Sequence, residues 1–180
     1  MVCTANQCRS PVAEGLLRQR IDAFGDGLQV GSAGIMQGGV GAPPEMVRAA
    51  HAFGLDLAHH RSQAIDWTTL DETELIITMM RRHVREVVVH DVGSWSKTFT
   101  FRELVRRGRV VGARGSEESL ADWVAKVHEG RMVTAMMGDD PSDDVADPMG
   151  GNPDDFDATV EILYGLVHEL TDLVWPAMPS

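Results

Sequence analysis

The stretch Cys3-Thr-Ala-Asn-Gln-Cys-Arg9-Ser10-Pro11 decides the fold of this chain. A cysteine and an arginine stand six positions apart, and Ser10-Pro11 opens a segment whose apolar residues recur at helical spacing. A loop that enters a helix in this way turns its backbone N–H groups toward an anion, because the unpaired amides and the helix dipole favour negative charge. The same field favours a thiolate at Cys3. Arg9 adds a planar fork for two oxygens of a phosphate-like group. The loop therefore predicts a nucleophile and an oxyanion cradle in one segment.

The rest of the chain alternates predicted helices with short apolar strands. We predict further strands at residues 28–30, 75–79 and 97–101. Helices are predicted at residues 10–23, 43–54, 81–89 and 152–174, together with a short basic helix ending near Arg107 and a helix capped by Ser116. This alternation indicates an α/β fold, a single parallel sheet of about four strands with helices on both faces. The loop of Cys3 then lies at the carboxyl end of the first strand, where sites in such sheets usually lie.

Two features of the predicted domain stand out. We expect one domain over residues 1–180, with a longer middle segment at about 94–143 that packs at the periphery rather than forming a specificity lid. Only Met1 and Val2 precede Cys3, whereas a strand usually has about five residues. The first strand is therefore expected to be truncated, either because it is genuinely short or because the natural chain starts upstream of Met1.

Composition excludes several function classes. The formal net charge of −11 argues against a nucleic-acid partner, and it means that phosphate capture depends on a local positive pocket. No run of 18 apolar residues is present, so we expect no membrane partner. The two cysteines, Cys3 and Cys8, form neither a secreted disulfide framework nor, without further Cys or His pairs, a zinc site. We expect a cytoplasmic protein with no metal and no cofactor, and the oligomeric state stays open.

The pattern Cys-x5-Arg-Ser-Pro, followed by Ala13-Glu14, resembles the low-molecular-weight protein tyrosine phosphatase family. Four further pieces occur in the order that the family has: Gly31–Gly34, His60–Ser62, Leu75–Met79 and Asp147-Pro148. The resemblance covers most of the chain outside residues 94–143. It implies a phosphotyrosine phosphatase I-like fold and a phosphatase of phosphorylated proteins or small phosphate esters.

The resemblance also implies roles for individual residues. Cys3 would be the nucleophile that forms a phosphocysteine, Arg9 would bind the phosphoryl oxygens, and Asp147 would be the general acid and then the base. Asp140-Pro141 is a rival for the acid, although Asp140 and Asp143 are also typical of a solvated acidic loop. The loop residues expected to bind substrate, by backbone or side chain, are Thr4, Ala5, Asn6, Gln7, Cys8 and Ser10. Ser32 and His60 are expected to support Asn6.

Several positions depart from the family's pattern and bear on the substrate. Ala5 stands where glycine is usual, so we expect a loop conformation that alanine can adopt. Met149-Gly150-Gly151 replaces the aromatic residues that commonly follow Asp-Pro, a form that resembles bacterial members including protein-arginine phosphatases. Gln7 fits neither the tyrosine-specific nor the arginine-specific pattern. Cys8 is at a position that can form a reversible disulfide with the nucleophile in this family.

The expected function is hydrolysis of a phosphorylated protein side chain, phosphotyrosine foremost, and three alternatives stay open. One is a protein-arginine phosphatase. Another is a thiol-dependent arsenate reductase, although no cysteine follows Cys8 to complete a three-cysteine relay. The third is an anion-binding module with weakened catalysis, which the short first strand favours and the presence of Cys3, Arg9 and Asp147 disfavours.

Overall fold

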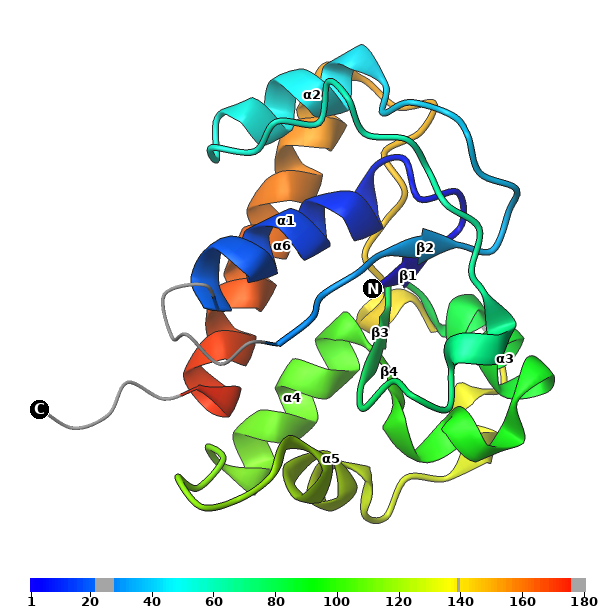
Figure 1. Ribbon diagram of the computed structural model, residues 1–180, viewed down its shortest axis with the longest axis vertical. Helices are drawn as coiled ribbons and strands as arrows, with labels where there is room; N and C mark the ends of the chain where they lie inside the picture. The colour runs from blue at the N-terminus through cyan, green and yellow to red at the C-terminus, as the bar shows by residue number, and fades with distance from the viewer. Residues whose placement is uncertain (22–27, 139, 176–180) are drawn as a thin grey trace, which may run out of the picture.

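The computed structural model describes residues 1–21, 28–138 and 140–175. Its centre is a parallel sheet with the strand order β2-β1-β3-β4 (Figure 1). The strands are β1 (Val2–Cys3), β2 (Ala33–Gly34), β3 (Ile76–Thr78) and β4 (Thr98–Thr100). Each has only two or three residues, so the short first strand resembles its neighbours in length. The predicted parallel sheet of about four strands is confirmed.

The central strand β1 pairs with neighbours on both sides. Val2 lies opposite Ala33 of β2 and Thr78 of β3, and Cys3 lies opposite Gly34. The strand predicted at residues 28–30 is therefore wrong in position. Because Val2 is paired with Ala33, the ladder between β1 and β2 begins after residue 30, and no strand forms at 28–30.

Six α-helices connect or flank the strands in the described part of the chain. They are α1 (Arg9–Ile21), α2 (Pro44–His51), α3 (Arg81–His90), α4 (Phe101–Val111), α5 (Leu120–His128) and α6 (Pro153–Val174). Residues 22 and 23 of the first predicted helix lie outside the described residues. Where the structure covers the chain, no helix has both the length and the apolar character that crossing a bilayer requires.

The helix caps follow the sequence signals in one case and differ in another. Asn152 accepts hydrogen bonds from the amides of Asp154 and Asp155, and Asp155 accepts in return from the Asn152 amide, which completes a capping box. The predicted cap at Ser116 is wrong. The residues after it form a turn, and Ser119 instead caps α5 by accepting from the Asp122 amide at 3.1 Å.

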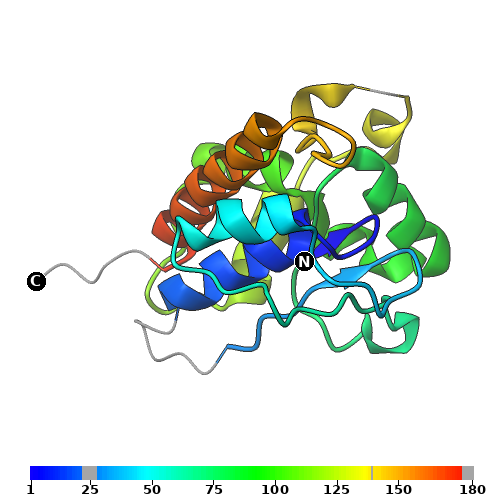
Figure 2. The same ribbon diagram turned by 90° about the horizontal axis from the view of Figure 1, so that it is seen from above.

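Helices lie against both faces of the sheet, as predicted. Successive side chains of a strand point to opposite faces, and the two faces carry separate apolar clusters. Ile77 joins the larger cluster, which includes residues of α1, α4 and α6. Ile76 joins a smaller one with Val2 and with Val87 of α3. Figure 2 shows α6, in orange to red, beside α2, in cyan.

The middle segment is not peripheral throughout, which corrects the expectation. Its first part supplies strand β4 and helix α4, and α4 packs on α6. Phe99, Phe101 and Leu104 are fully buried there. Their burial was not evident from the sequence because it depends on contacts with β3 and α6, which are distant along the chain.

Gly34 of β2 packs closely against the loop that follows β1. A Cβ atom at Gly34 would lie 2.7 Å from the Ala5 carbonyl carbon and 2.8 Å from the Asn6 nitrogen. Gly34→Ala should therefore lower the free energy of unfolding by about 1–3 kcal/mol, because backbone has to shift. Chemical denaturation measures this effect. Gly31→Ala is the matched control, since its Cβ would meet no atom of the described residues within 4 Å; equal losses in both variants would contradict the prediction.

Candidate active site

The loop between β1 and α1 forms the centre of the site. It runs from Cys3 at the carboxyl end of β1 to Arg9, the first residue of α1. Within the described residues, the backbone N–H groups of Ala5, Gln7 and Cys8 have no acceptor. Buried amides are rarely left unpaired in proteins, and amides gathered at a helix start form an anion-binding concavity. The loop can therefore bind an oxyanion directly beside Cys3.

The Cys3 sulfur lies at the base of this loop, and the residue is only 2% exposed. Ser10 Oγ is 3.0 Å from Cys3 Sγ, and the Asn6 amide donates to the same sulfur at 3.2 Å. Both groups can donate a hydrogen bond to a thiolate, which is the nucleophilic form of cysteine. The sequence places Cys3 and Ser10 in one motif, and the structure brings them into contact.

Asn6 holds the loop in shape through its side chain and its backbone. Its φ of +52° is in the left-handed region, which asparagine tolerates better than most residues. The side-chain nitrogen Nδ2 donates to Ser10 Oγ at 2.9 Å and to Ser32 Oγ at 2.7 Å. The amide oxygen accepts from the Gln63 N–H at 2.9 Å, and His60 Nε2 donates to the Asn6 carbonyl at 2.6 Å. Ser32 and His60 thus contact Asn6, and Gln63 is a partner that the sequence did not indicate.

Alanine fits at position 5 without backbone strain. Of the non-glycine residues that the structure describes, Asn6 alone has a positive φ. Ala5 therefore adopts a conformation open to any L-residue, as expected. The close packing falls instead on Gly34, which lies against Ala5 and Asn6.

Arg9 and Asp147 meet at the open side of the loop. Arg9 is 1% exposed, and its Nη2 donates to Asp147 Oδ2 at 2.5 Å. Nη1 donates to the Val145 carbonyl at 3.1 Å. The Nε of Arg9 is buried and has no partner among the described residues. An oxyanion bound in the loop would supply the missing acceptor, because Arg presents its donors as a fork suited to phosphate.

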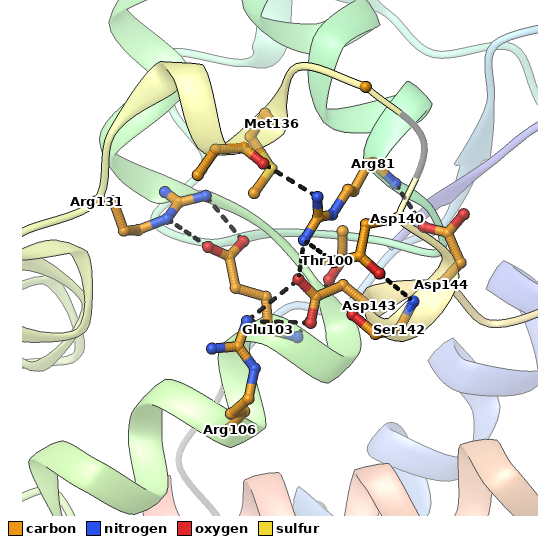
Figure 3. Close-up of polar contacts among 12 residues, drawn as sticks. Arg81, Thr100, Glu103, Arg106, Arg131, Met136, Asp140, Ser142, Asp143 and Asp144 are labelled. Atoms are coloured by element: carbon orange, nitrogen blue, oxygen red, sulfur yellow. Dashed lines mark hydrogen bonds and ion pairs between the residues drawn. The ribbon is translucent and has the colours of Figure 1, made fainter.

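Asp147 comes from a loop that α3 and α4 hold in place. Figure 3 shows Asp143 between the guanidinium groups of Arg81 and Arg106, at 2.8 and 3.0 Å. The neighbouring Asp144 accepts from the Arg81 amide at 2.8 Å, at the start of α3. Asp143 is therefore a buried anchor, which corrects the expectation that it is solvated. The Asp147 side chain itself is 32% exposed and is therefore accessible to solvent.

Asp140, the rival candidate for the acid, makes contacts that stabilise the local fold. It is exposed, accepts from the Ser142 amide at 3.0 Å and pairs with Arg81 at 3.3 Å. The hydrogen bond from the Ser142 amide is the main cause that lowers its pKa. Asp140 caps a short turn, whereas Asp147 contacts Arg9.

Arg82 and His83 reach the loop from α3, and no motif indicated them. His83 Nε2 lies 3.0 Å from Thr4 Oγ1, and Arg82 Nη2 donates to the same oxygen at 2.8 Å. Burial, followed by the charges of Arg9 and Arg82, lowers the pKa of His83 to about 3, so the imidazole is neutral. The available signal was their position directly after β3, since residues there lie at the same sheet edge as the loop of Cys3.

Cys8 is the second thiol of the loop and has a different character. Burial, followed by the nearby Asp147 charge, raises its pKa to about 12. Its Sγ lies 3.5 Å from the Met149 sulfur, and both cysteines are free.

Among the residues with described positions, no group of three His, Cys, Asp or Glu side chains could hold a metal ion. A cavity of about 660 Å³ at the amino ends of the strands is lined by neither Cys3, Arg9 nor Asp147.

The raised pKa of Cys8 predicts slow alkylation. In a Cys3→Ser variant Cys8 is the remaining thiol. With a pKa of about 12, about one thiol in a thousand is ionised at pH 9. Iodoacetamide should therefore modify the native variant slowly at pH 7–9, as followed by mass spectrometry. Unfolding in guanidinium is the control, because it restores an ordinary thiol pKa and fast reaction. Equal rates in the native and unfolded states would contradict the prediction.

Comparison with known proteins agrees with this geometry. The sequence model of the low molecular weight phosphotyrosine protein phosphatase family matches residues 1–111. The probable low molecular weight protein-tyrosine-phosphatase EpsP of Ralstonia solanacearum is 32% identical over 105 residues, which cover 58% of this chain and 70% of that protein. Arsenate reductase 2 of Staphylococcus haemolyticus is 37% identical over 78 residues, which cover 43% of this chain and 56% of the reductase.

Solved structures extend the likeness to nearly the whole chain. The low molecular weight protein tyrosine phosphatase from T. tengcongensis has a TM-score of 0.69 and 28% identity, with 95% of each chain covered. The YwlE arginine phosphatase from Geobacillus stearothermophilus, at 24% identity and a TM-score of 0.67 over 95% of this chain and 88% of its own, shares the fold. The chain belongs to the low molecular weight phosphotyrosine protein phosphatase family, and it is a cysteine-dependent phosphatase.

Proposed function

We propose that this chain removes the phosphoryl group from phosphorylated protein side chains, phosphotyrosine foremost, through a phosphocysteine at Cys3. The observation that supports this most strongly is the composition of one loop. It combines the Cys3 sulfur, three amides without acceptors among the described residues and the unpartnered Nε of Arg9. These donors suit a tetrahedral oxyanion bound beside the nucleophile.

In the first step the Cys3 thiolate attacks phosphorus. The S–P bond forms as the P–O bond to the leaving group breaks. The loop amides and Arg9 bind the phosphoryl oxygens and stabilise the charge that develops on them. Asp147 now accepts from Arg9 Nη2, so the arriving phosphoryl group would compete with it for the guanidinium. Once the phosphoryl group has displaced it from Arg9, Asp147 would take up a proton from solvent and then transfer this proton to the leaving oxygen.

In the second step Asp147 acts as the base. Its carboxylate takes a proton from a water molecule that attacks the phosphocysteine, and the S–P bond breaks. Inorganic phosphate leaves, and the Cys3 sulfur returns as a thiolate. Ser10 Oγ and the Asn6 amide, at 3.0 and 3.2 Å from the sulfur, would stabilise this leaving thiolate. Thr4, Ala5, Gln7 and Cys8 contribute to binding through the backbone of the loop.

The raised pKa of Cys8 disfavours a cysteine relay of the kind that reduces arsenate. Such a relay needs a second thiolate to attack the first sulfur. Cys8, the chain's other cysteine, has a pKa raised to about 12 by its burial, so it is a poor attacking group near neutral pH. A free thiol nucleophile suits a reducing compartment, and we propose a cytoplasmic location with phosphorylated proteins as partners.

Asp147→Asn tests the assignment of the acid. With phenyl phosphate, whose leaving oxygen needs a proton, kcat should fall by about 10²–10⁴-fold. The loss should be smaller with p-nitrophenyl phosphate, because its leaving group is a better anion. Asp140→Asn is the matched control, since Asp140 caps a turn and pairs with Arg81. Steady-state kinetics measure kcat of both variants with both esters.

An undiminished rate in Asp147→Asn, or an equal loss with both esters, would contradict the acid role. Cys3→Ser should abolish turnover with every substrate, and residual wild-type rates in that variant would reject the covalent mechanism. The same preparations, given a phosphotyrosine peptide, a phosphoarginine peptide and arsenate with a small thiol, test the substrate class. The proposal expects the highest kcat/KM with phosphotyrosine.

A further inference from the structure

Arg82 extends from α3 to the loop that carries the nucleophile. It lies in the first turn of the helix and is exposed, and its Nη2 donates to Thr4 Oγ1 at 2.8 Å. Thr4 directly follows Cys3 in the sequence. An exposed guanidinium is thus held beside the loop, although the two residues are 78 positions apart in the chain.

The Thr4 hydroxyl fixes Arg82 in this position. Arg9 Nη2 donates to Thr4 Oγ1 at 3.3 Å, and Arg82 Nη2 donates to it at 2.8 Å. A hydroxyl accepts through two lone pairs and donates one proton, so its O–H points to His83 Nε2 at 3.0 Å. That geometry requires a neutral imidazole, which agrees with the lowered pKa of His83. The hydroxyl has no further capacity, and the arrangement around it is fully specified.

The charge of Arg82 has no partner in the described chain. Several other exposed arginines pair with carboxylates, such as Arg18 with Glu14, Arg48 with Asp157 and Arg109 with Glu169. No carboxylate of the described residues lies within 4.0 Å of the Arg82 guanidinium, whose acceptor is a neutral hydroxyl. Its remaining donors are available, and a guanidinium binds a carboxylate through two of them at once.

The charges around the loop differ between its two ends. At the Cys8 end, the charges of Asp147 and Glu45 act on the thiol and contribute to its raised pKa. At the Thr4 end, the charges of Arg9 and Arg82 act on His83 and lower its pKa. Arg9 is paired with Asp147, so Arg82 is the uncompensated cation of this end among the described residues. The charge of Arg82, held at the Thr4 hydroxyl, would attract a substrate carboxylate to this end of the loop.

We propose that Arg82 is a specificity-determining residue that binds a carboxylate next to the phosphorylated side chain, so that the preferred substrates are acidic phosphopeptides. This inference rests on the proposed function. The surface of the chain is anionic as a whole, with a net charge of −11. An acidic substrate is therefore recognised through one local contact rather than through long-range attraction.

The test uses two phosphotyrosine peptides that differ only in Glu or Gln at the positions flanking phosphotyrosine. Wild-type enzyme should show a kcat/KM about tenfold higher for the Glu peptide, as expected for a charge-assisted contact at a partly exposed site. Arg82→Gln should reduce this preference to near unity, and Arg82→Lys should restore part of it. Arg109→Gln is the matched control, because it removes one exposed charge from a remote pair with Glu169. The ratio of the two peptides on one preparation cancels any difference in the folded fraction.

A second readout separates recognition from structural support. In the Cys3→Ser background, the Kd of each peptide is measured by calorimetry with and without the additional substitution Arg82→Gln. This substitution should weaken binding of the Glu peptide alone, whereas a structural role would weaken both equally and would overturn the proposal. A wild-type enzyme without preference between the peptides would also overturn it. A wild-type enzyme that hydrolyses neither peptide would instead refute the proposed function.

Discussion

The hydrogen bonds of Asn6 are the interaction on which the site depends. A loop that leaves its amides free for an anion cannot stabilise itself through those amides, so other groups have to hold it. Asn6 does this from a left-handed backbone position, with contacts to Ser10, Ser32, Gln63 and His60. These partners come from α1 and from the segments around residues 32 and 60–63. Three parts of the chain thus converge on one side chain, and the loop is preorganised before any ligand arrives.

The same constraint explains how a first strand of two residues can support the site. The pairing of β1 continues beyond the strand, because the Cys3 and Thr4 carbonyls accept from the amides of Ile35 and Met36 at 3.1 and 2.9 Å. Gly34 allows β2 to approach the loop without a side chain in between. The loop is thus anchored by the residues after Cys3 as well as by those before it.

The middle of the chain also holds the loop of Asp147 in place. Arg81 of α3 and Arg106 of α4 meet at the buried Asp143, and the Val145 amide donates to the Met79 carbonyl at 2.8 Å. Further along, Arg131 binds Glu103 of α4 in a buried pair and stacks on Trp95 and Phe99. Figure 3 shows the ion pairs of Asp143 and Glu103 side by side. Buried ion pairs are weak evidence for stability, but they require one geometry, which suits a loop that holds Asp147 beside Arg9.

Local signals made much of this structure predictable, and long-range contacts account for the parts that were not. The Cys3 loop and the caps of α6 were readable because their determinants are within a few residues of each other. The predicted position of strand β2 is wrong because its register depends on pairing with β1. The prediction that Asp143 is solvated is wrong because its partners Arg81 and Arg106 are far away in sequence. Arg82 belongs to no recognisable motif. Its contact with Thr4 depends on the pairing of β3 with β1, which local sequence does not reveal.

Trapping the covalent intermediate identifies the sulfur that attacks phosphorus. Enzyme mixed with a phosphotyrosine peptide is quenched within milliseconds, digested, and analysed by fragmentation mass spectrometry, which assigns a phosphoryl group to one of the two sulfurs in the loop peptide. We predict phosphorylation at Cys3. In Asp147→Asn the intermediate should accumulate with p-nitrophenyl phosphate, whose leaving group hardly needs a proton, because hydrolysis of the intermediate is then the step that is slowed. A phosphoryl group on Cys8 or elsewhere, or phosphate release in a single turnover of Cys3→Ser, would contradict this prediction.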